Sequence, residues 1–165
     1  GIYEKFGSLF IFHTWFSLGI TAIVFILKNN TLLFTYLAII SISISDTLAY
    51  EFGRRYGKRK LIEHISPNKT IEGLIAGLFS GTIAMFLSVI LNTDTGPLIA
   101  LIISFIFICF GVLGDLFVSK IKRSLSVKDA SSLLPGHGGL LDRVDSYLLS
   151  FPVLLLFSQF SYLIP

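Results

Sequence analysis

The sequence predicts an all-α membrane protein, a polytopic bundle of about five transmembrane helices with two long polar loops on one membrane face. Of its 165 residues, 53% are hydrophobic and only 14% are charged, and the mean hydropathy is +0.81. Soluble domains usually carry about 25% charged residues, so a water-soluble fold of this size could not bury so much apolar surface. Two further observations, the length of the apolar stretches and the placement of the basic residues, support this class over an unusually apolar soluble core.

Five apolar stretches reach or approach the roughly 20 residues that a helix needs to cross about 30 Å of hydrocarbon. In chain order they are Phe6–Leu27, Thr31–Tyr50, Leu74–Leu91, Pro97–Val118 and Tyr147–Ile164. The polar loops Glu51–Gly73 and Ser119–Ser146 follow the second and the fourth stretch, and short connections join the others. Five crossings therefore place the N-terminus and both long loops on the same side.

The charged residues agree with this topology. Only Lys28 among the 13 basic residues falls on the opposite side. The other twelve are Lys5, Arg54, Arg55, Lys58, Arg59, Lys60, Lys69, Lys120, Lys122, Arg123, Lys128 and Arg143. An excess of Lys and Arg marks cytoplasmic loops, so the loop side is predicted to face the cytoplasm.

Two carboxylates, Asp46 and Asp115, fall inside the cytoplasmic ends of apolar stretches. A carboxylate costs about 2.5–3.5 kcal/mol near the bilayer centre and less toward the interface. Such residues usually face a polar cavity, a partner or a metal, although both could also extend to the interface as isolated charges.

The second long loop brings further carboxylates and basic residues beside Asp115. If the fourth helix continues beyond the membrane, Asp115, Ser119 and Lys122 share one face, because they are four and then three residues apart. Asp142 and Asp145 are likewise three residues apart at the start of the fifth helix. Between these helices, residues 135–139 form a glycine-rich turn that brings backbone amides together.

This combination suits a nucleoside triphosphate held with Mg²⁺. The ion usually binds through one or two carboxylates and substrate phosphates, while basic side chains and exposed amides take the remaining phosphate charge. A solvated loop of mixed charge that anchors a helix among lipid headgroups is the alternative.

The first long loop repeats the theme. Ser66 followed by Pro67 is typical of a helix N-cap and first helical position, and helix N-termini attract phosphate. Taken alone, the basic cluster at residues 54–60 is more often a patch that sets the topology and binds anionic lipid headgroups. The sequence contains no Walker A, GxGxxG or HExxH motif, and its single cysteine, Cys109, excludes an intramolecular disulfide.

Three ordered motifs carry a resemblance to a known family. They are Asp46-x-x-Ala49-Tyr50 through Gly57-Lys58, then Ser66-Pro67-x-Lys69-Thr70-x-Glu72-Gly73, and finally the run from Ser119 through Lys122-Arg123, Lys128-Asp129, Pro135 and His137-Gly138-Gly139 to Asp142-Arg143 and Asp145. Together they resemble the phosphatidate cytidylyltransferases, also called CDP-diacylglycerol synthases. Members of that family usually have further membrane segments before this region. We therefore expect residues 1–165 to form a single integral membrane catalytic domain that corresponds to the C-terminal portion of the family.

The resemblance implies a reaction and a set of site residues. Phosphatidate would attack CTP to give CDP-diacylglycerol and pyrophosphate, in phospholipid biosynthesis. Asp115, Asp142 and Asp145 would be catalytic and would bind Mg²⁺ or Mn²⁺. Asp115 and Asp142 would be the principal ligands, and Asp145 would be a third ligand or would support the other two. Lys122 would be a further catalytic residue, and a monovalent cation is a further candidate cofactor. The implied substrate-binding residues are Ser66, Lys69, Thr70, Ser119, Arg123, Lys128, Asp129, His137, Gly138, Gly139 and Arg143. For His137, a purely conformational role in the turn stays open.

The implied partners are CTP, phosphatidate and membrane lipid, without nucleic acid, and a homodimer is the candidate assembly. The implied location is a bacterial inner membrane with the site facing the cytoplasm. Two other classes stay open: a CTP-dependent polyprenol kinase, which would transfer the γ-phosphoryl group, and a non-catalytic membrane fragment or anchoring subunit.

Overall fold

The fold is described from a computed structural model, which describes residues 2–29, 32–124 and 141–161, with side chains at 13–29, 32–123 and 144–158. Its helices are α1 (Ile2–Asn29), α2 (Leu32–Tyr56), α3 (Ile71–Asn92), α4 (Pro97–Ser124) and α5 (Leu141–Ser161). Over its described residues, each apolar stretch predicted from the sequence lies in one helix, so the predicted helical bundle is confirmed. The fold departs from a purely helical one at the strands β1 (Lys60–Ile62) and β2 (Ser66–Thr70).

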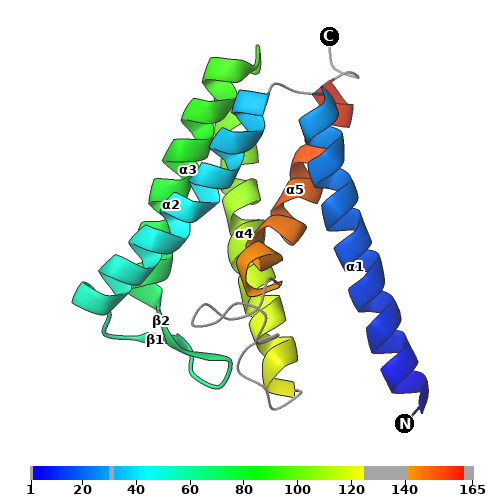
Figure 1. Cartoon of the computed structure of the whole chain (residues 1–165). Helices are drawn as coiled ribbons and strands as arrows, with labels where there is room; N and C mark the ends of the chain where they lie inside the picture. The colour runs from blue at the N-terminus through cyan, green and yellow to red at the C-terminus, as the bar shows by residue number, and fades with distance from the viewer. Residues whose placement is uncertain (1, 30–31, 125–140, 162–165) are drawn as a thin grey trace.

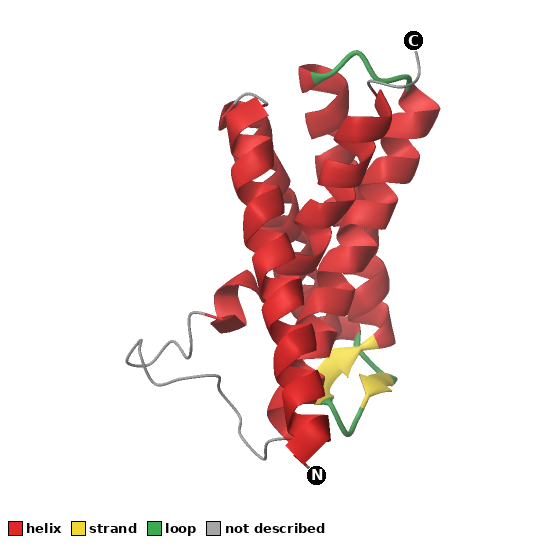
Figure 2. Cartoon of the chain, turned by 90° about the vertical axis from the view of Figure 1, so that its right-hand side faces the viewer, coloured by secondary structure: helices red, strands yellow, loops and turns green. Residues whose placement is uncertain are grey.

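The helices run along one another, and the hairpin lies at the end of the bundle where the chain begins (Figures 1 and 2). α2 packs along α3, α4 packs between α3 and α5, and α1 packs mainly against α5. The largest buried side chains include Phe107 and Phe151, whose rings meet edge to face with centroids 5.8 Å apart. Close packing of this kind stabilises helix association in lipid, where the solvent is as apolar as the side chains.

α2 and α3 approach closely because three glycines, Gly73, Gly77 and Gly81, face α2 at four-residue intervals. A Cβ atom added at Gly73 would lie 2.4 Å from the Ala49 carbonyl oxygen, and one at Gly77 would lie 2.8 Å from the Ser45 carbonyl oxygen. Small residues at this spacing let the backbones of membrane helices come together. The contact fixes the part of α2 that carries Ser45 and Ala49.

α1 contacts α5 where a proline removes one backbone hydrogen bond of α5. Pro152 lies inside α5 and has no N–H to donate to the carbonyl of Leu148, four residues earlier. Gly19 of α1 packs against this carbonyl, and a Cβ atom added there would lie 2.6 Å from the Leu148 oxygen. Trp15 joins Val118 and Leu148 in a second small apolar cluster beside this contact.

The first polar loop is shorter and more ordered than predicted. α2 continues to Tyr56, and most of the rest of the predicted loop Glu51–Gly73 forms the antiparallel β1–β2 hairpin. The predicted N-cap at Ser66 and Pro67 is wrong, because both residues lie in β2. The N-cap of α3 is Thr70, which has extended backbone angles (φ −122°, ψ 156°) and whose hydroxyl accepts a hydrogen bond from the Gly73 amide at 3.2 Å.

Among the described residues, three helices are long and apolar enough to span a membrane: Leu32–Tyr56, Ile71–Asn92 and Pro97–Arg123. Val144–Ser158 is a shorter apolar helix. Large apolar side chains such as Phe79, Leu91 and Leu98 are at least 70% exposed on the outside of the bundle. A surface of this kind is expected of helices that face lipid.

Candidate active site

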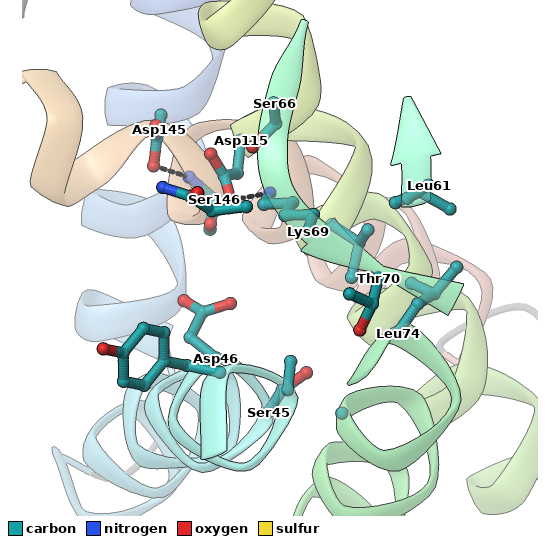
Figure 3. Close-up of a pocket in the computed structure, with 15 residues that line it drawn as sticks. Ser45, Asp46, Leu61, Ser66, Lys69, Thr70, Leu74, Asp115, Asp145 and Ser146 are labelled. Carbon is teal, nitrogen blue, oxygen red and sulfur yellow. Dashed lines mark hydrogen bonds and ion pairs between the residues drawn. The ribbon is translucent and has the colours of Figure 1, made fainter. Parts of the chain in front are cut away.

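A cavity of about 390 Å³ opens at the hairpin end of the bundle (Figure 3). Residues from every described element except α1 line it. They are Ser45, Asp46, Ala49 and Tyr50 of α2, Leu61 of β1, Ser66, Asn68, Lys69 and Thr70 of β2, Leu74 and Gly77 of α3, Val112 and Asp115 of α4, and Asp145 and Ser146 of α5. The cavity therefore exists only in the assembled bundle.

Three carboxylates converge on this cavity from three different helices: Asp46, Asp115 and Asp145 (Figure 3). Asp145 is only 5% exposed, Asp115 is half-buried and Asp46 is exposed to the cavity. Their negative charges lie close enough to repel one another. Such a cluster needs positive charge beside it, because like charges with little solvent around them are costly.

Lys69 of β2 supplies part of this positive charge. Its ammonium group forms an ion pair with one carboxylate oxygen of Asp115, between side chains that are 31% and 28% exposed. The other Asp115 oxygen accepts a hydrogen bond from the Ser119 hydroxyl, one turn later in α4, at 3.4 Å. The predicted helical face that carries Asp115 and Ser119 is thus confirmed.

Asp145 is held within the first turns of α5. Its Oδ1 accepts a hydrogen bond from the Ser146 amide at 2.8 Å. The positive charge of Lys122, on the continuation of α4, also acts on this carboxylate. Asp145 and Lys122 belong to the same predicted motif, and the charge of Lys122 on α4 acts on the carboxylate of Asp145 on α5.

The structure brings together some predicted site residues and leaves others apart. Ser66, Lys69, Thr70, Asp115 and Asp145 all line the cavity. Thr70 is buried, and its hydroxyl also caps α3.

Arg123 differs from the prediction in its main contact. Its Nε donates a hydrogen bond to the Ile65 carbonyl at the tip of the hairpin, at 3.2 Å. It does not line the cavity described above. The reason is geometric, because Arg123 lies two turns beyond Asp115 on α4.

The remaining predicted residues lie outside the described part of the chain. They are Lys128, Asp129, His137, Gly138 and Gly139. Asp142 and Arg143 lie in the first turn of α5, but their side chains are outside the described ones.

Asp46 is the main site residue that the sequence prediction left unassigned. Its position inside an apolar stretch was a signal of a polar cavity, and the structure places it there. Ser45, Asn68 and Ser146 also line the cavity. Serine and asparagine are common in membrane helices and in turns alike, so the sequence carries little signal for these three.

The donor set fits a hard divalent cation shared with a bound phosphate. Within the described side chains, no three His, Cys, Asp or Glu residues are close enough to form a preformed metal site. Mg²⁺ does not need one, because it usually binds through one or two carboxylates and completes its shell with water and substrate phosphates. Carboxylates, a lysine and serine hydroxyls around one cavity can therefore bind a phosphorylated ligand together with its cation.

The chain is similar in sequence to known proteins. Residues 1–161 match the cytidylyltransferase family. The chain is 41% identical over 128 residues to the phosphatidate cytidylyltransferase of Staphylococcus saprophyticus and 44% identical over 130 residues to that of Staphylococcus aureus strain COL. Each match covers 77% of this chain and 49% of the relative, so the chain spans about half the length of these relatives.

A solved structure shares the fold. It is described as an intramembrane enzyme for archaeal membrane lipid biosynthesis. The two chains are 24% identical and superpose with a TM-score of 0.50 over 72% of this chain and 76% of the other. The likeness supports the arrangement of the helices.

Proposed function

The chain belongs to the cytidylyltransferase family, and we propose that it forms the catalytic half of a phosphatidate cytidylyltransferase. The observation that carries the proposal is the cavity at one end of an apolar bundle, where Asp46, Lys69, Asp115 and Asp145 converge from separate elements. A water-soluble nucleotide and a lipid headgroup can meet at this level, while the acyl chains stay in the bilayer. The names of the relatives favour this activity over a CTP-dependent kinase.

In the proposed reaction, a phosphate oxygen of phosphatidate forms a bond to the α-phosphorus of CTP. The bond between that phosphorus and the oxygen bridging to the β-phosphorus breaks, and pyrophosphate leaves. Catalysis of such a step is mainly positioning and neutralisation of charge. Lys69 lines the cavity, and the charge of Lys122 acts on Asp145, which supports a role for both ammonium groups in neutralising phosphate oxygens.

We assign Asp115 and Asp145 as holders of a Mg²⁺ or Mn²⁺ ion, and Asp142 as a third by resemblance to the family. When bound, the ion would neutralise triphosphate charge and orient the phosphate chain. Asp115 is already oriented by Ser119 and Lys69, and Asp145 by the Ser146 amide. These contacts would keep the carboxylate oxygens oriented toward the ion, so binding would need no large rearrangement.

A labelling experiment tests the reaction directly. The chain is reconstituted in vesicles that contain both phosphatidate and a polyprenol, and it is given CTP labelled with ³²P at either the α- or the γ-phosphate, with Mg²⁺. Lipids are then extracted and counted. Cytidylyl transfer puts the α-label into lipid and the γ-label into pyrophosphate.

The two labels separate the candidate functions. Label from the γ-position in lipid would identify a kinase and overturn the proposal. Absence of both labels from lipid would show that the chain is not catalytic by itself. An Asp115→Asn variant, run in parallel, reports any label that a contaminating enzyme transfers.

A further inference from the structure

We propose that Glu72 is a positioning residue that fixes the β1–β2 hairpin and thereby places Lys69 in the cavity. Glu72 lies outside the cavity described above and was not among the predicted site residues. The expected effect of Glu72 on the reaction rate rests on the proposed function, whereas its effect on the structure of the hairpin does not.

The Glu72 carboxylate connects the segment just before β1 to the segment just after β2. Its Oε2 accepts hydrogen bonds from the amides of Lys58 and Arg59, at 3.1 and 3.3 Å. Its Oε1 accepts a hydrogen bond from Nε of Arg59 at 3.3 Å. These three bonds, which we call the Glu72 clasp, tie the segment that enters β1 to the first turn of α3. The Ile71 amide, which donates to the Arg59 carbonyl at 3.0 Å, completes the same junction.

The hairpin needs such support because it is small. β1 has three residues, and the pairing between Lys60–Thr70 and Ile62–Ser66 is irregular in register. An isolated two-stranded hairpin is marginally stable in water. Its tip has a separate support, the bond from Arg123 to the Ile65 carbonyl.

The clasp acts at the end of β2 where Lys69 lies. Lys69 is three residues before Glu72, and Thr70, between them, caps α3. A shift of the chain at this end of β2 would therefore move the Lys69 backbone directly. A shift of the hairpin tip would reach Lys69 only through the length of β2. The ammonium group of Lys69 must meet Asp115 on α4, so a small displacement of β2 would separate the pair.

A carboxylate suits this position better than an amide. It can accept all three hydrogen bonds, while a glutamine would turn one NH₂ group toward N–H donors. Its negative charge is also favourable in the first turn of a helix. Glu72→Gln therefore removes at least one bond of the clasp with little change in volume, and Glu72→Ala removes all three.

Hydrogen–deuterium exchange of the vesicle-embedded chain tests the structural part without any need for activity. We expect faster exchange at residues 58–71 in Glu72→Gln and Glu72→Ala, with unchanged exchange in α2 and α4. Glu63→Gln is the matched control, because Glu63 is exposed in the turn of the same hairpin and the substitution makes the same charge change. Unchanged exchange in both Glu72 variants, or equal changes in Glu63→Gln, would overturn the proposal.

A double-mutant cycle tests the link to Lys69. Misplacement of a group by about 1 Å can cost on the order of 100-fold in rate, so we expect Glu72→Gln to lower kcat by about 10- to 100-fold. In a Lys69→Ala background the same substitution should have little further effect on kcat, because the residue that it positions is already gone. Equal effects in both backgrounds would show that Glu72 acts on the general fold, and would overturn the positioning role. If the wild-type chain forms no CDP-lipid, the proposed function fails, while the exchange experiment still decides the role of Glu72 in the hairpin.

Discussion

At the scale of single residues, Asp115 is held from two sides, by Lys69 on one oxygen and by Ser119 on the other. The positive charge of Lys69 also acts on Asp46, while that of Lys122 acts on Asp145. The ion pair between Lys69 and Asp115 has a structural role as well. It joins α4 to the hairpin, two elements that the chain order keeps far apart. The residue is therefore both an electrostatic and a structural centre of the site.

The substitution Asp115→Asn removes the charge that pairs with Lys69 and that would bind the proposed cation. We expect turnover to fall by about 100-fold or more, by analogy with other preorganised sites, while the bundle stays folded. The measurement is cytidylyl transfer at fixed Mg²⁺, with melting temperature in detergent as the check on folding. Asp94→Asn is the control, because Asp94 is an exposed carboxylate at the opposite end of the bundle. Near wild-type turnover in Asp115→Asn would remove Asp115 from the site.

Lys122 and Lys120 offer a matched pair on the same helix. Lys122 is half-buried and acts on Asp145, while Lys120 is exposed. Lys122→Ala should therefore lower kcat at saturating substrate, whereas Lys120→Ala should leave kcat unchanged. The rates are compared in detergent micelles at a fixed phosphatidate mole fraction and at two salt concentrations. Equal, salt-sensitive losses in both variants would mean that this stretch of α4 serves only as an electrostatic anchor.

Arg59 illustrates where sequence reasoning about single residues reached its limit. Its place in the basic cluster 54–60 indicated a headgroup-binding role for Arg59 and Lys60. The structure shows Arg59 paired with Glu72 and Lys60 donating to the Pro67 carbonyl at 2.6 Å. Basic residues in a cluster look alike in sequence. Only the folded hairpin distinguishes those that make contacts within the hairpin from those that are available to lipid headgroups.

At the scale of elements, apolar length predicted the helices well, because the hydrocarbon thickness fixes how many apolar residues a span needs. It predicted their ends poorly. α2 and α4 both continue past the last apolar residues, to Tyr56 and Ser124, since charged side chains are compatible with a helix that leaves the membrane. The hairpin was missed because its strands are short and polar and lack an alternating pattern. The position of Ser66 and Pro67 before an apolar stretch favoured a helix start, but Thr70 lies closer to that helix and its hydroxyl reaches the Gly73 amide.

Gly77 tests the contact between α2 and α3. A Cβ atom there would lie 2.8 Å from both the Ala49 Cβ and the Ser45 carbonyl oxygen, so Gly77→Val forces the helices apart. Overpacking of this kind typically costs about 1–3 kcal/mol of stability. We expect a lower melting temperature in detergent and reduced activity, because Ser45 and Ala49 line the cavity. Gly96→Ala is the control, since nothing lies within 4 Å of an added Cβ there; equal stability of Gly77→Val and wild type would contradict the close contact.

At the scale of the whole molecule, the hairpin, the end of α2 and the end of α4 all lie at one end of the bundle (Figures 1 and 2). The basic residues of these segments led to the expectation that this end faces the cytoplasm. The predicted homodimer and the monovalent cation stay predictions.

Cysteine labelling in intact cells tests the orientation. In a Cys109→Ala background, a cysteine at Asn68 should resist an impermeant external reagent, while one at Asp94 should react. Both positions are exposed, and they lie at opposite ends of α3, because Asn68 is in β2, just before this helix, and Asp94 comes just after its last residue. Reaction at position 68 together with protection at position 94 would reverse the topology.

The cavity lies on a seam between two halves of the chain. α2 and the hairpin contribute Asp46 and Lys69, and α4 and α5 contribute Asp115 and Asp145. The link between the halves, Thr93–Gly96, is at the far end of α3 from the hairpin, and α3 and α4 pack together without it. The site should therefore form even when the chain is cut at this link. We expect fragments 1–94 and 95–165 to be inactive when each is made alone. Made together in the same membrane, they should recover the activity of the intact chain.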